Sequence, residues 1–193
     1  MYDYVKGEVV ELTPTYAVIE AGGIGYFVNI SLHTYTCLGS AKSALLYLHL
    51  AIREDAHTLY GFYERAEREL FRQLISVSGI GSNTARMMLS SLSPEELRVA
   101  ILSEDVNRIK SVKGIGIKTA QRVVIDLKDK LGKVPITGEI FAFANNTVRD
   151  EALSALVMLG FAKVPAQKVI DILLTSKRDI SLEELIKLSL KQL

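Results

Sequence analysis

The chain of 193 residues has no tryptophan, one cysteine, three histidines and four prolines. Because Cys37 is alone, the chain can form neither an internal disulfide nor a zinc site built on several thiolates. His33, His49 and His57 have no cluster of further ligands around them, so we expect no metal and no other cofactor. The apolar runs end well short of the ~20 residues that a membrane helix needs, and no secretory signal opens the sequence. We therefore expect a cytoplasmic protein.

An excess of charge of one sign is also lacking, since 23 Lys and Arg oppose 22 Asp and Glu, for a net charge of +1. The charge is unevenly distributed. Residues 1–63 carry 3 basic and 6 acidic side chains, residues 64–131 carry 12 and 9, and residues 132–193 carry 8 and 7. Affinity for phosphate depends on local charge more than on the total, so a nucleic-acid partner is compatible with this balance, and the middle segment is the expected contact.

The first 63 residues contain five short runs rich in Tyr, Val, Ile and Phe, separated by turn residues. These runs predict strands over residues 5–12, 16–20, 26–31, 45–53 and 58–62. Five such strands indicate a small closed barrel, and the OB-fold is the five-stranded barrel that often binds nucleic acid. From residue 64 the apolar period becomes helical, and Ser-Pro-Glu-Glu at 93–96 is a strong helix start.

Residues 132–147, GKVPITGEIFAFANNT, lose this periodicity and predict a linker. After it we expect three helices, over residues 148–159, 165–175 and 182–192, the last opened by Ser181 with Glu184. Their small core leaves apolar surface that a partner protein explains better than stability does. The expected fold is therefore multi-domain β and α, with a barrel over 1–63, an all-α domain over 64–131, the linker, and a three-helix domain over 148–193.

A duplication lies in the middle segment. Residues 74–85, LISVSGIGSNTA, return as residues 109–120, IKSVKGIGIKTA, so that Gly79 and Gly114 are 35 residues apart. Each copy predicts a helix that ends at the first glycine, a short turn whose isoleucine plugs the gap between helices, and a new helix after the second glycine. This is the helix-hairpin-helix pattern.

The chemistry of this pattern suits phosphate. The second glycines, Gly81 and Gly116, place no Cβ over the backbone, and the first N–H groups of the following helix have no internal partner and lie at the positive end of its dipole. One such turn could merely connect two packed helices. Two matched turns can hold the phosphates of both strands across a minor groove, so we predict binding to the nucleic-acid backbone without reading of bases.

Taken together, these features resemble the RuvA family, the Holliday-junction-binding subunits of the bacterial branch-migration machine. The resemblance covers the whole chain, and the strings REDAHTLYGF and KGIGIKTAQR are similar to those of the family. It implies an amino-terminal OB-fold, a central tandem helix-hairpin-helix domain and a mobile, UBA-like three-helix domain. It also implies a homotetramer, alone or as paired tetramers, that holds a four-way junction open and square in DNA recombination and repair. In this resemblance the chain has no catalytic site of its own, the hexameric ATPase RuvB is its motor, and the nuclease RuvC resolves the product.

The resemblance also assigns residues to roles. We expect the DNA contacts at Gly79, Gly81, Ser82, Thr84 and Arg86 in the first hairpin, and at Gly114, Gly116, Lys118, Thr119 and Arg122 in the second. The chain departs from the family where Asn83 and Ile117 replace frequent lysines, which predicts weaker and less salt-sensitive contact there. The resemblance makes Glu54 and Asp55 an acidic pin that keeps strands apart at the crossover. It places the contact with the motor at Leu156, Leu159, Phe161 and Leu190.

Other classes of function fit the sequence less well. A nucleoside triphosphatase is excluded by spacing, because the phosphate-binding loop requires glycine where Val112 and Ile117 stand. A DNA glycosylase would need a base-flipping pocket with a catalytic Asp or Lys, and Asp126 and Lys128 fit a solvated helix face instead. The remaining alternative is a general OB-fold and helix-hairpin-helix adaptor for single strands or RNA, which requires exposed aromatics interleaved with basic residues. Packing in the barrel core is the simpler explanation for the aromatic residues in the predicted strands, which are Tyr16, Tyr26, Phe27, Tyr47, Tyr60 and Phe62.

Overall fold

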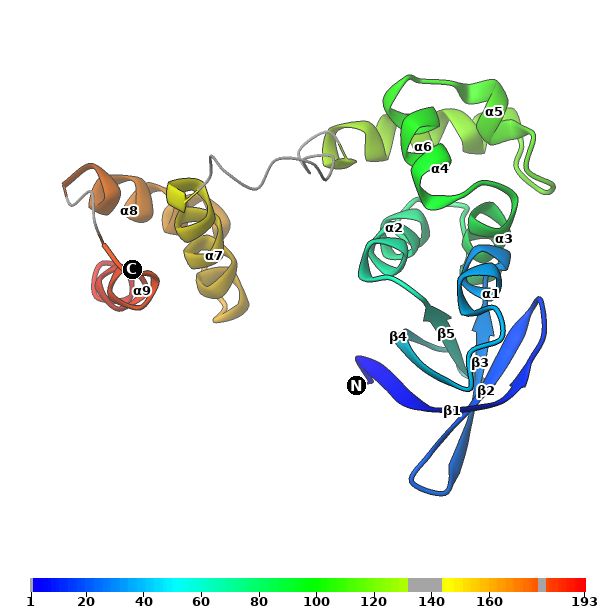
Figure 1. Cartoon of the computed structure of the whole chain (residues 1–193). Coiled ribbons are helices and arrows are strands. Elements are labelled where there is room, and N and C mark those ends of the chain that lie inside the picture. Colours follow the sequence, from blue (N-terminus) through cyan, green and yellow to red (C-terminus); the bar gives the residue numbers. More distant parts are fainter. Residues whose placement is uncertain (1, 132–143, 177–179) are drawn as a thin grey trace. The chain divides into compact units, whose positions relative to one another are not determined.

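The computed structural model describes residues 2–131, 144–176 and 180–193 (Figure 1). The chain divides into two compact units, Met1–Pro135 and Ile136–Leu193. The first unit contains two clusters of buried apolar side chains, and the second unit contains one. Among the described residues, no helix is long and apolar enough to cross a membrane.

Five strands form a closed barrel in the order β1-β2-β3-β5-β4. Their bounds are Tyr4–Leu12 (β1), Tyr16–Ala21 (β2), Ile24–Ile30 (β3), Ser43–Ile52 (β4) and His57–Phe62 (β5). The β3–β5 pair is parallel, and the other neighbouring strands are antiparallel. Alternate side chains such as Ala17, Ile19, Val28 and Ile30 point inward and are buried. The predicted OB-fold barrel is confirmed, and each predicted strand overlaps an observed one.

A short helix, α1 (Leu32–Leu38), lies between β3 and β4 and was not predicted. Seven residues are too few for a clear apolar period, and the helix contains threonine and tyrosine, which are modest helix formers. Ser31 begins the helix, since its hydroxyl accepts a hydrogen bond from the Thr34 N–H at 3.0 Å. Gly39, with φ of 54°, ends it.

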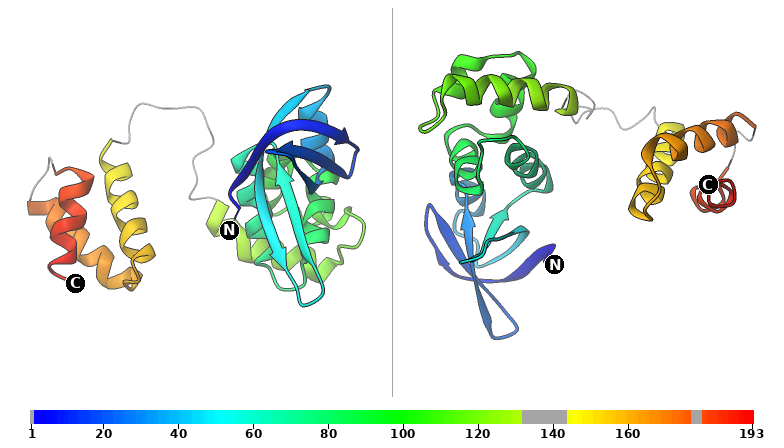
Figure 2. Two further views of the ribbon diagram at one scale, coloured as in Figure 1. Left: turned by 90° about the horizontal axis from the view of Figure 1, so that it is seen from below. Right: turned by 180° about the vertical axis from the view of Figure 1, so that it is seen from behind.

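Five helices lie on one side of the barrel, as Figure 2 shows from two further directions. They are α2 (Arg65–Ile75), α3 (Ser82–Ser91), α4 (Pro94–Leu102), α5 (Val106–Lys110) and α6 (Ile117–Leu131). Helix α2 packs against β4 and β5, while the others pack on α2 and on one another. The predicted start of α4 is confirmed, because Ser93 and Glu96 form a reciprocal capping box. The core of the helices extends into the barrel, where Phe71 of α2 lies 4.8 Å from Phe62 and 5.2 Å from Tyr60 between ring centroids. The hairpin helices are therefore joined to the barrel through buried aromatic side chains that belong to one core.

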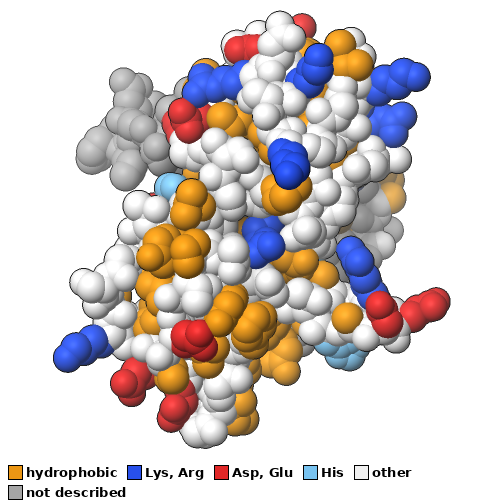
Figure 3. Space-filling view, turned by 90° about the vertical axis from the view of Figure 1, so that its right-hand side faces the viewer, with side chains coloured by type: hydrophobic (Ala, Val, Ile, Leu, Met, Phe, Trp, Pro, Cys, Tyr) orange, Lys and Arg blue, Asp and Glu red, His pale blue; other side chains and the backbone are white. Residues whose placement is uncertain are grey.

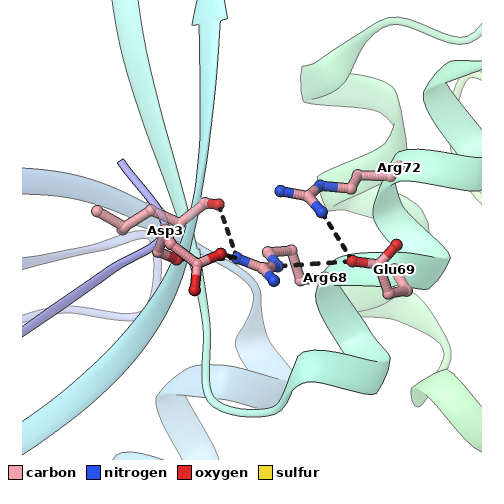
Figure 4. A network of polar contacts seen from close by, with 5 residues as sticks. Asp3, Arg68, Glu69 and Arg72 are labelled. Carbon is pink, nitrogen blue, oxygen red and sulfur yellow. Dashed lines mark hydrogen bonds and ion pairs between the residues drawn. The ribbon is translucent and has the colours of Figure 1, made fainter. Parts of the chain in front are cut away.

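A buried arginine on α2 joins this helix to the start of the chain (Figure 4). Nη1 of Arg68 donates to the Asp3 carbonyl oxygen at 2.8 Å and to the Asp3 carboxylate at 2.6 Å. The hydrogen bond from Arg68 holds the pKa of the Asp3 carboxyl below its usual value. Arg68 also lies 3.7 Å from Glu69, which accepts from Arg72 at 2.8 Å. The guanidinium of Arg68 stacks over the Tyr47 ring, 5.5 Å from its centroid.

A buried carboxyl group joins α1, β5 and α2. Glu67 is fully buried and accepts hydrogen bonds from the hydroxyls of Ser31 and Thr34, the latter at 2.7 Å. The same Thr34 hydroxyl accepts from the Tyr63 N–H at 3.0 Å. Burial raises the pKa of Glu67, and the two hydroxyl hydrogen bonds act in the opposite direction. Barrel and hairpin helices are thus held by polar contacts as well as by the shared core.

The described residues of the second unit form three helices, α7 (Ala144–Met158), α8 (Lys163–Ser176) and α9 (Leu182–Leu190). Ser181 caps α9, as predicted, by accepting from the Glu184 N–H at 3.2 Å. The core of the unit consists of small and aliphatic side chains, which include Ala152, Leu156, Ala166, Ile170 and Leu185. Of the linker expected at 132–147, residues 132–143 lie outside the described residues, and the last four belong to α7.

Candidate nucleic-acid interface

The two hairpins have the same backbone geometry. The φ angles are 94° at Gly79 and 88° at Gly114, a region that L side chains rarely adopt, which explains why glycine ends each first helix. The isoleucine that follows, Ile80 or Ile115, is 5% exposed and fills the gap between the helices, as predicted. Each turn is therefore a rigid corner whose backbone is exposed and whose side chain is buried.

The hydrogen bonds of the corners are also duplicated. Four backbone N–H groups donate to the carbonyl three residues before them, at 3.0–3.3 Å. The Val77 N–H donates to the Leu74 carbonyl, as the Val112 N–H donates to Ile109 35 residues later. The Ile80 N–H donates to the Val77 carbonyl, as the Ile115 N–H donates to Val112 at the same spacing. The duplication in the sequence is thus a duplication of structure down to single hydrogen bonds.

Each corner presents the start of a helix. Gly81 begins α3 without any side-chain cap, and its carbonyl accepts from the Ala85 N–H at 2.9 Å. Gly116 has the same 2.9 Å hydrogen bond from Ala120. A Cβ built on Gly116 meets no heavy atom within 4 Å. The first N–H groups of α3 and α6 are therefore open to an approaching anion.

Two contacts between the copies hold the corners together. Nη1 of Arg122, on α6, donates to the Ser78 carbonyl of the first corner at 3.2 Å. In the other direction, Met87 of α3 reaches the second corner, where its Cε lies 3.7 Å from the position of a Cβ on Gly114. Met87 and Arg122 occupy equivalent places in the duplication, 35 residues apart. Each copy of the duplication therefore reaches the corner of the other from the same position.

Arg86 connects the first hairpin to the barrel. Its Nη1 donates to the Thr15 carbonyl at 2.8 Å, and its Nη2 donates to Oδ1 of Asn83 at 3.0 Å. Asn83, which stands where the family often has lysine, is thus a partner of Arg86. The remaining predicted contacts lie around the corners, with Ser82, Thr84 and Thr119 half-buried and Lys118 exposed. The structure brings all ten predicted DNA-contact residues to these two corners and the helices that they open.

The acidic turn connects β4 and β5. The Arg53 N–H donates to the Ala56 carbonyl at 2.9 Å, which leaves Glu54 and Asp55 as the two residues of a tight hairpin loop. Both are exposed. The guanidinium of Arg53 reaches the first corner, where Nη2 lies 4.0 Å from the position of a Cβ on Gly81. The sequence did not predict that the acidic turn and the first hairpin are neighbours.

Charge is distributed over the first unit as the sequence indicated. Figure 3 shows one face of it, with most Lys and Arg side chains over the upper part and the middle, where a few acidic side chains lie among them, and further acidic side chains along the lower edge. A pair of acidic side chains projects together from the side of this face. Within the described parts of the chain, no group of three or more His, Cys, Asp or Glu side chains could hold a metal ion.

The expected core packing holds for only part of the strand aromatics. Tyr16, Tyr26 and Tyr47 are half-buried, and Phe27 departs most clearly. Phe27 is 55% exposed and stacks on Tyr16, with 4.6 Å between ring centroids. Tyr60 and Phe62 are buried, as expected. Phe27 lies on the outer face of the barrel because its neighbour Val28 points inward, and the alternation of a strand places the two on opposite faces.

The second unit exposes apolar side chains at the ends of α7 and α9. Met158 is 89% exposed, Leu159 is 60% exposed and Leu190, at the end of α9, is 42% exposed. Of the other predicted motor contacts, Phe161 is half-buried and Leu156 is fully buried, so Leu156 belongs to the core of the unit. Sequence reasoning missed Met158, because a residue at the end of a helix has no periodic pattern that reveals whether it is exposed.

A closed OB barrel and two helix-hairpin-helix corners with open helix starts define a nucleic-acid-binding protein. Comparison with known proteins agrees and is more specific. The model of the RuvA N terminal domain matches residues 1–61, that of the SAM-like helix-hairpin-helix tandem matches residues 71–129, and that of the RuvA C-terminal domain matches residues 147–193. The chain belongs to the RuvA family.

Relatives match over the full length. Proteins of Christiangramia forsetii and Flavobacterium psychrophilum are 53% and 49% identical over 193 residues, covering 100% of both chains. A protein of Bacteroides fragilis is 52% identical over 201 aligned positions, again covering 100% of both chains. Each of these relatives carries the name Holliday junction branch migration complex subunit RuvA.

Proposed function

We propose that this chain binds four-way DNA junctions through their sugar-phosphate backbone and serves as the DNA-recognition subunit of a branch-migration complex. The observation that carries this function is the pair of corners, which repeat φ angle, hydrogen bonds and open helix start at one spacing. The name that its relatives share supports the junction as the ligand and branch migration as the process. In this function the chain holds and shapes DNA, and it carries out no chemical step itself.

Each corner binds one strand in this proposal. The open N–H groups and the positive end of the helix dipole attract a phosphate, and two corners at fixed separation hold the phosphates of both strands across a minor groove. Such contacts are independent of base sequence. The proposed DNA-binding residues are Gly79, Gly81, Ser82, Thr84, Arg86, Gly114, Gly116, Lys118, Thr119 and Arg122.

The acidic turn separates the strands in the same proposal. We infer a homotetramer, with domains at 1–63, 64–131 and 148–193, whose four copies of Glu54 and Asp55 surround the crossover. Negative charges gathered there repel phosphates and direct each strand along its own arm. The double variant Glu54→Gln, Asp55→Asn should therefore bind a junction as tightly as the wild type or more tightly, while its rate of branch migration with RuvB changes. Loss of junction binding in this variant would contradict the role of the turn.

The second unit recruits the motor. Its exposed Met158, Leu159 and Leu190 offer an apolar surface, and unpaired apolar surface of this kind is typical of a protein contact. We propose the ATPase RuvB as the partner at this surface, and the nuclease RuvC as the enzyme that acts on the junction while it is held open.

A competition experiment tests the proposal. A labelled four-way junction with immobile arms is bound to the purified chain, and unlabelled junction, linear duplex and single strand compete at fixed salt concentration. The proposal expects the junction to compete far better than the other two, and the mass of the complex in solution to correspond to four or eight chains per junction. Equal competition by linear duplex, or a complex with one chain, would overturn it.

One observation favours the adaptor as a second candidate. The exposed Phe27 ring, stacked on Tyr16, is the kind of surface on which unpaired bases stack. If single strand were the best competitor, and if Phe27→Ala removed that preference, the adaptor would replace the junction as the function.

A further inference from the structure

Arg53 differs from the other arginines of the first unit in having no partner. No described residue of the chain forms a hydrogen bond, ion pair or ring contact with its guanidinium. Each of the other arginines in residues 2–131 has an internal partner. The pairs are Arg65 and Tyr47, Arg68 and Asp3, Arg72 and Glu69, Arg86 and Thr15, Arg98 and Leu131, Arg108 and Glu96, and Arg122 and Ser78.

The absence of a partner is unexpected at this place in the chain. Arg53 is followed directly by two carboxylates, Glu54 and Asp55, and neither comes within the 4.0 Å of an ion pair. Within the turn only the backbone of Arg53 is engaged, through the hydrogen bond from its N–H to the Ala56 carbonyl. The positive charge of Arg53 is therefore not neutralised by the acidic turn that it begins.

The guanidinium instead reaches the first corner. Nη2 is the nearest heavy atom to the position of a Cβ on Gly81, at 4.0 Å, and Gly81 begins α3 without a side-chain cap. An anion that docks on the first N–H groups of α3 is thus within reach of this guanidinium as well. Arginine suits that position because its planar fork can bind two phosphate oxygens at once.

We propose that Arg53 is a DNA-binding residue, which holds, together with the first N–H groups of α3, the backbone phosphate that lies nearest the crossover. Arg53 then attracts the strand on one side of the turn while Glu54 and Asp55 repel it on the other. This inference rests on the proposed function and adds a residue to its site. Because the acidic turn meets DNA only where strands part, Arg53 contributes more to junction binding than to binding of linear duplex.

The variant Arg53→Gln tests this role, with Lys42→Gln as its matched control. Arg53 follows β4 and Lys42 precedes it, so the two exposed cations stand at opposite ends of one strand. Both variants remove one positive charge from the barrel. We expect Arg53→Gln to weaken junction binding by about tenfold or more at low salt, and duplex binding by less. The negative slope of log K against log salt should become shallower by about 0.9 for each subunit whose Arg53 contacts a phosphate. Lys42→Gln should change neither quantity.

A junction with single uncharged phosphates separates direct contact from long-range attraction. Methylphosphonates are placed one at a time at the first three linkages from the crossover, and the wild type and Arg53→Gln are titrated with each. Direct contact predicts one linkage at which the wild type loses more affinity than Arg53→Gln does, because the variant keeps only the N–H groups of α3 at that phosphate. Arg53→Lys should recover much of the salt dependence and only part of the affinity, since lysine keeps the charge and lacks the fork.

The outcomes distinguish the two proposals. If the wild type prefers junctions and Arg53→Gln binds them like Lys42→Gln, the role of Arg53 is wrong and the proposed function stands. Equal losses at all three linkages for the wild type and the variant would also overturn the direct contact. If the wild type shows no preference for junctions, the proposed function itself fails.

Discussion

Adding a single methyl group at Gly81 or at Gly116 should separate DNA binding from folding. The φ angle of Gly81 is −88°, which alanine adopts without strain, and its Cβ would meet Arg53 Nη2 only at 4.0 Å. At Gly116 nothing lies within 4 Å of the added atom. Alanine at the start of a helix costs up to ~1 kcal/mol of stability relative to glycine. The unfolded chain has less conformational entropy with alanine than with glycine, which offsets about 0.4–1 kcal/mol of this cost. The free energy of unfolding should therefore change little in either variant.

Binding should respond differently, because the methyl group stands over the N–H groups that a phosphate must approach. A hydrogen bond to a charged group contributes about 1.5–3 kcal/mol, so the loss of one at each corner corresponds to roughly 10- to 100-fold in affinity. The assay is the fluorescence anisotropy of a labelled four-way junction, titrated at fixed salt. Denaturant unfolding of the same samples gives the stability.

A glycine with positive φ in the second unit provides the opposite control. Gly160 has φ of 99° with nothing within 4 Å of an added Cβ, so Gly160→Ala should destabilise that unit by about 1–2 kcal/mol and leave junction affinity unchanged. Wild-type affinity in both Gly81→Ala and Gly116→Ala would refute the reasoning. So would a large loss of stability in those two variants, because the methyl group would then act on the fold.

Three further variants test separate parts of the molecule. Ile117 is 51% exposed at the second corner, so Ile117→Lys should tighten junction binding. It should also steepen the slope of log K against log salt by about 0.9 for each new phosphate contact. An unchanged slope would place Ile117 away from DNA. Because burial raises the pKa of Glu67, the folded state binds the proton more tightly, and wild-type stability should fall as pH rises from the ordinary value of 4.5 through the raised one. Glu67→Gln should remove this dependence in unfolding curves measured at a series of pH values, and a slope that survives would have another origin. Met158→Asp should leave the thermal midpoint unchanged and weaken binding to RuvB in calorimetry, whereas unchanged affinity would exclude Met158 from that contact.

The corners could be predicted from the sequence because their determinants are local. A glycine at the end of a helix, an isoleucine after it and a second glycine specify one turn, and the φ angles at Gly79 and Gly114 agree with that expectation. The capping box at Ser93 and the five strands were predictable for the same reason. Each of these features depends on residues within about one turn of helix or one strand.

The rest of the site depends on contacts between distant segments. Arg53 and Gly81 are 28 residues apart, and no periodic pattern brings an acidic turn beside a hairpin. Exposure was predicted poorly for a similar reason, since Leu156 and Phe27 are apolar residues whose burial is decided by the element that packs against them. The partners of Arg86 likewise required the tertiary structure, because one of them is the Thr15 carbonyl, 71 residues away.

The two corners keep their backbone and differ in their side chains, and physical reasoning explains why. The phosphates of a duplex stand at fixed separation across the minor groove, so the separation of the corners is constrained whereas the charge at each corner is adjustable. Accordingly the equivalent positions Met87 and Arg122 both reach the opposite corner, one through a methyl group and the other through a hydrogen bond. The same freedom lets Asn83, which lacks a positive charge, stand at the place equivalent to Lys118 in the second corner. In the proposed function, cations around the corners therefore tune the strength of binding, and the backbone determines what is bound.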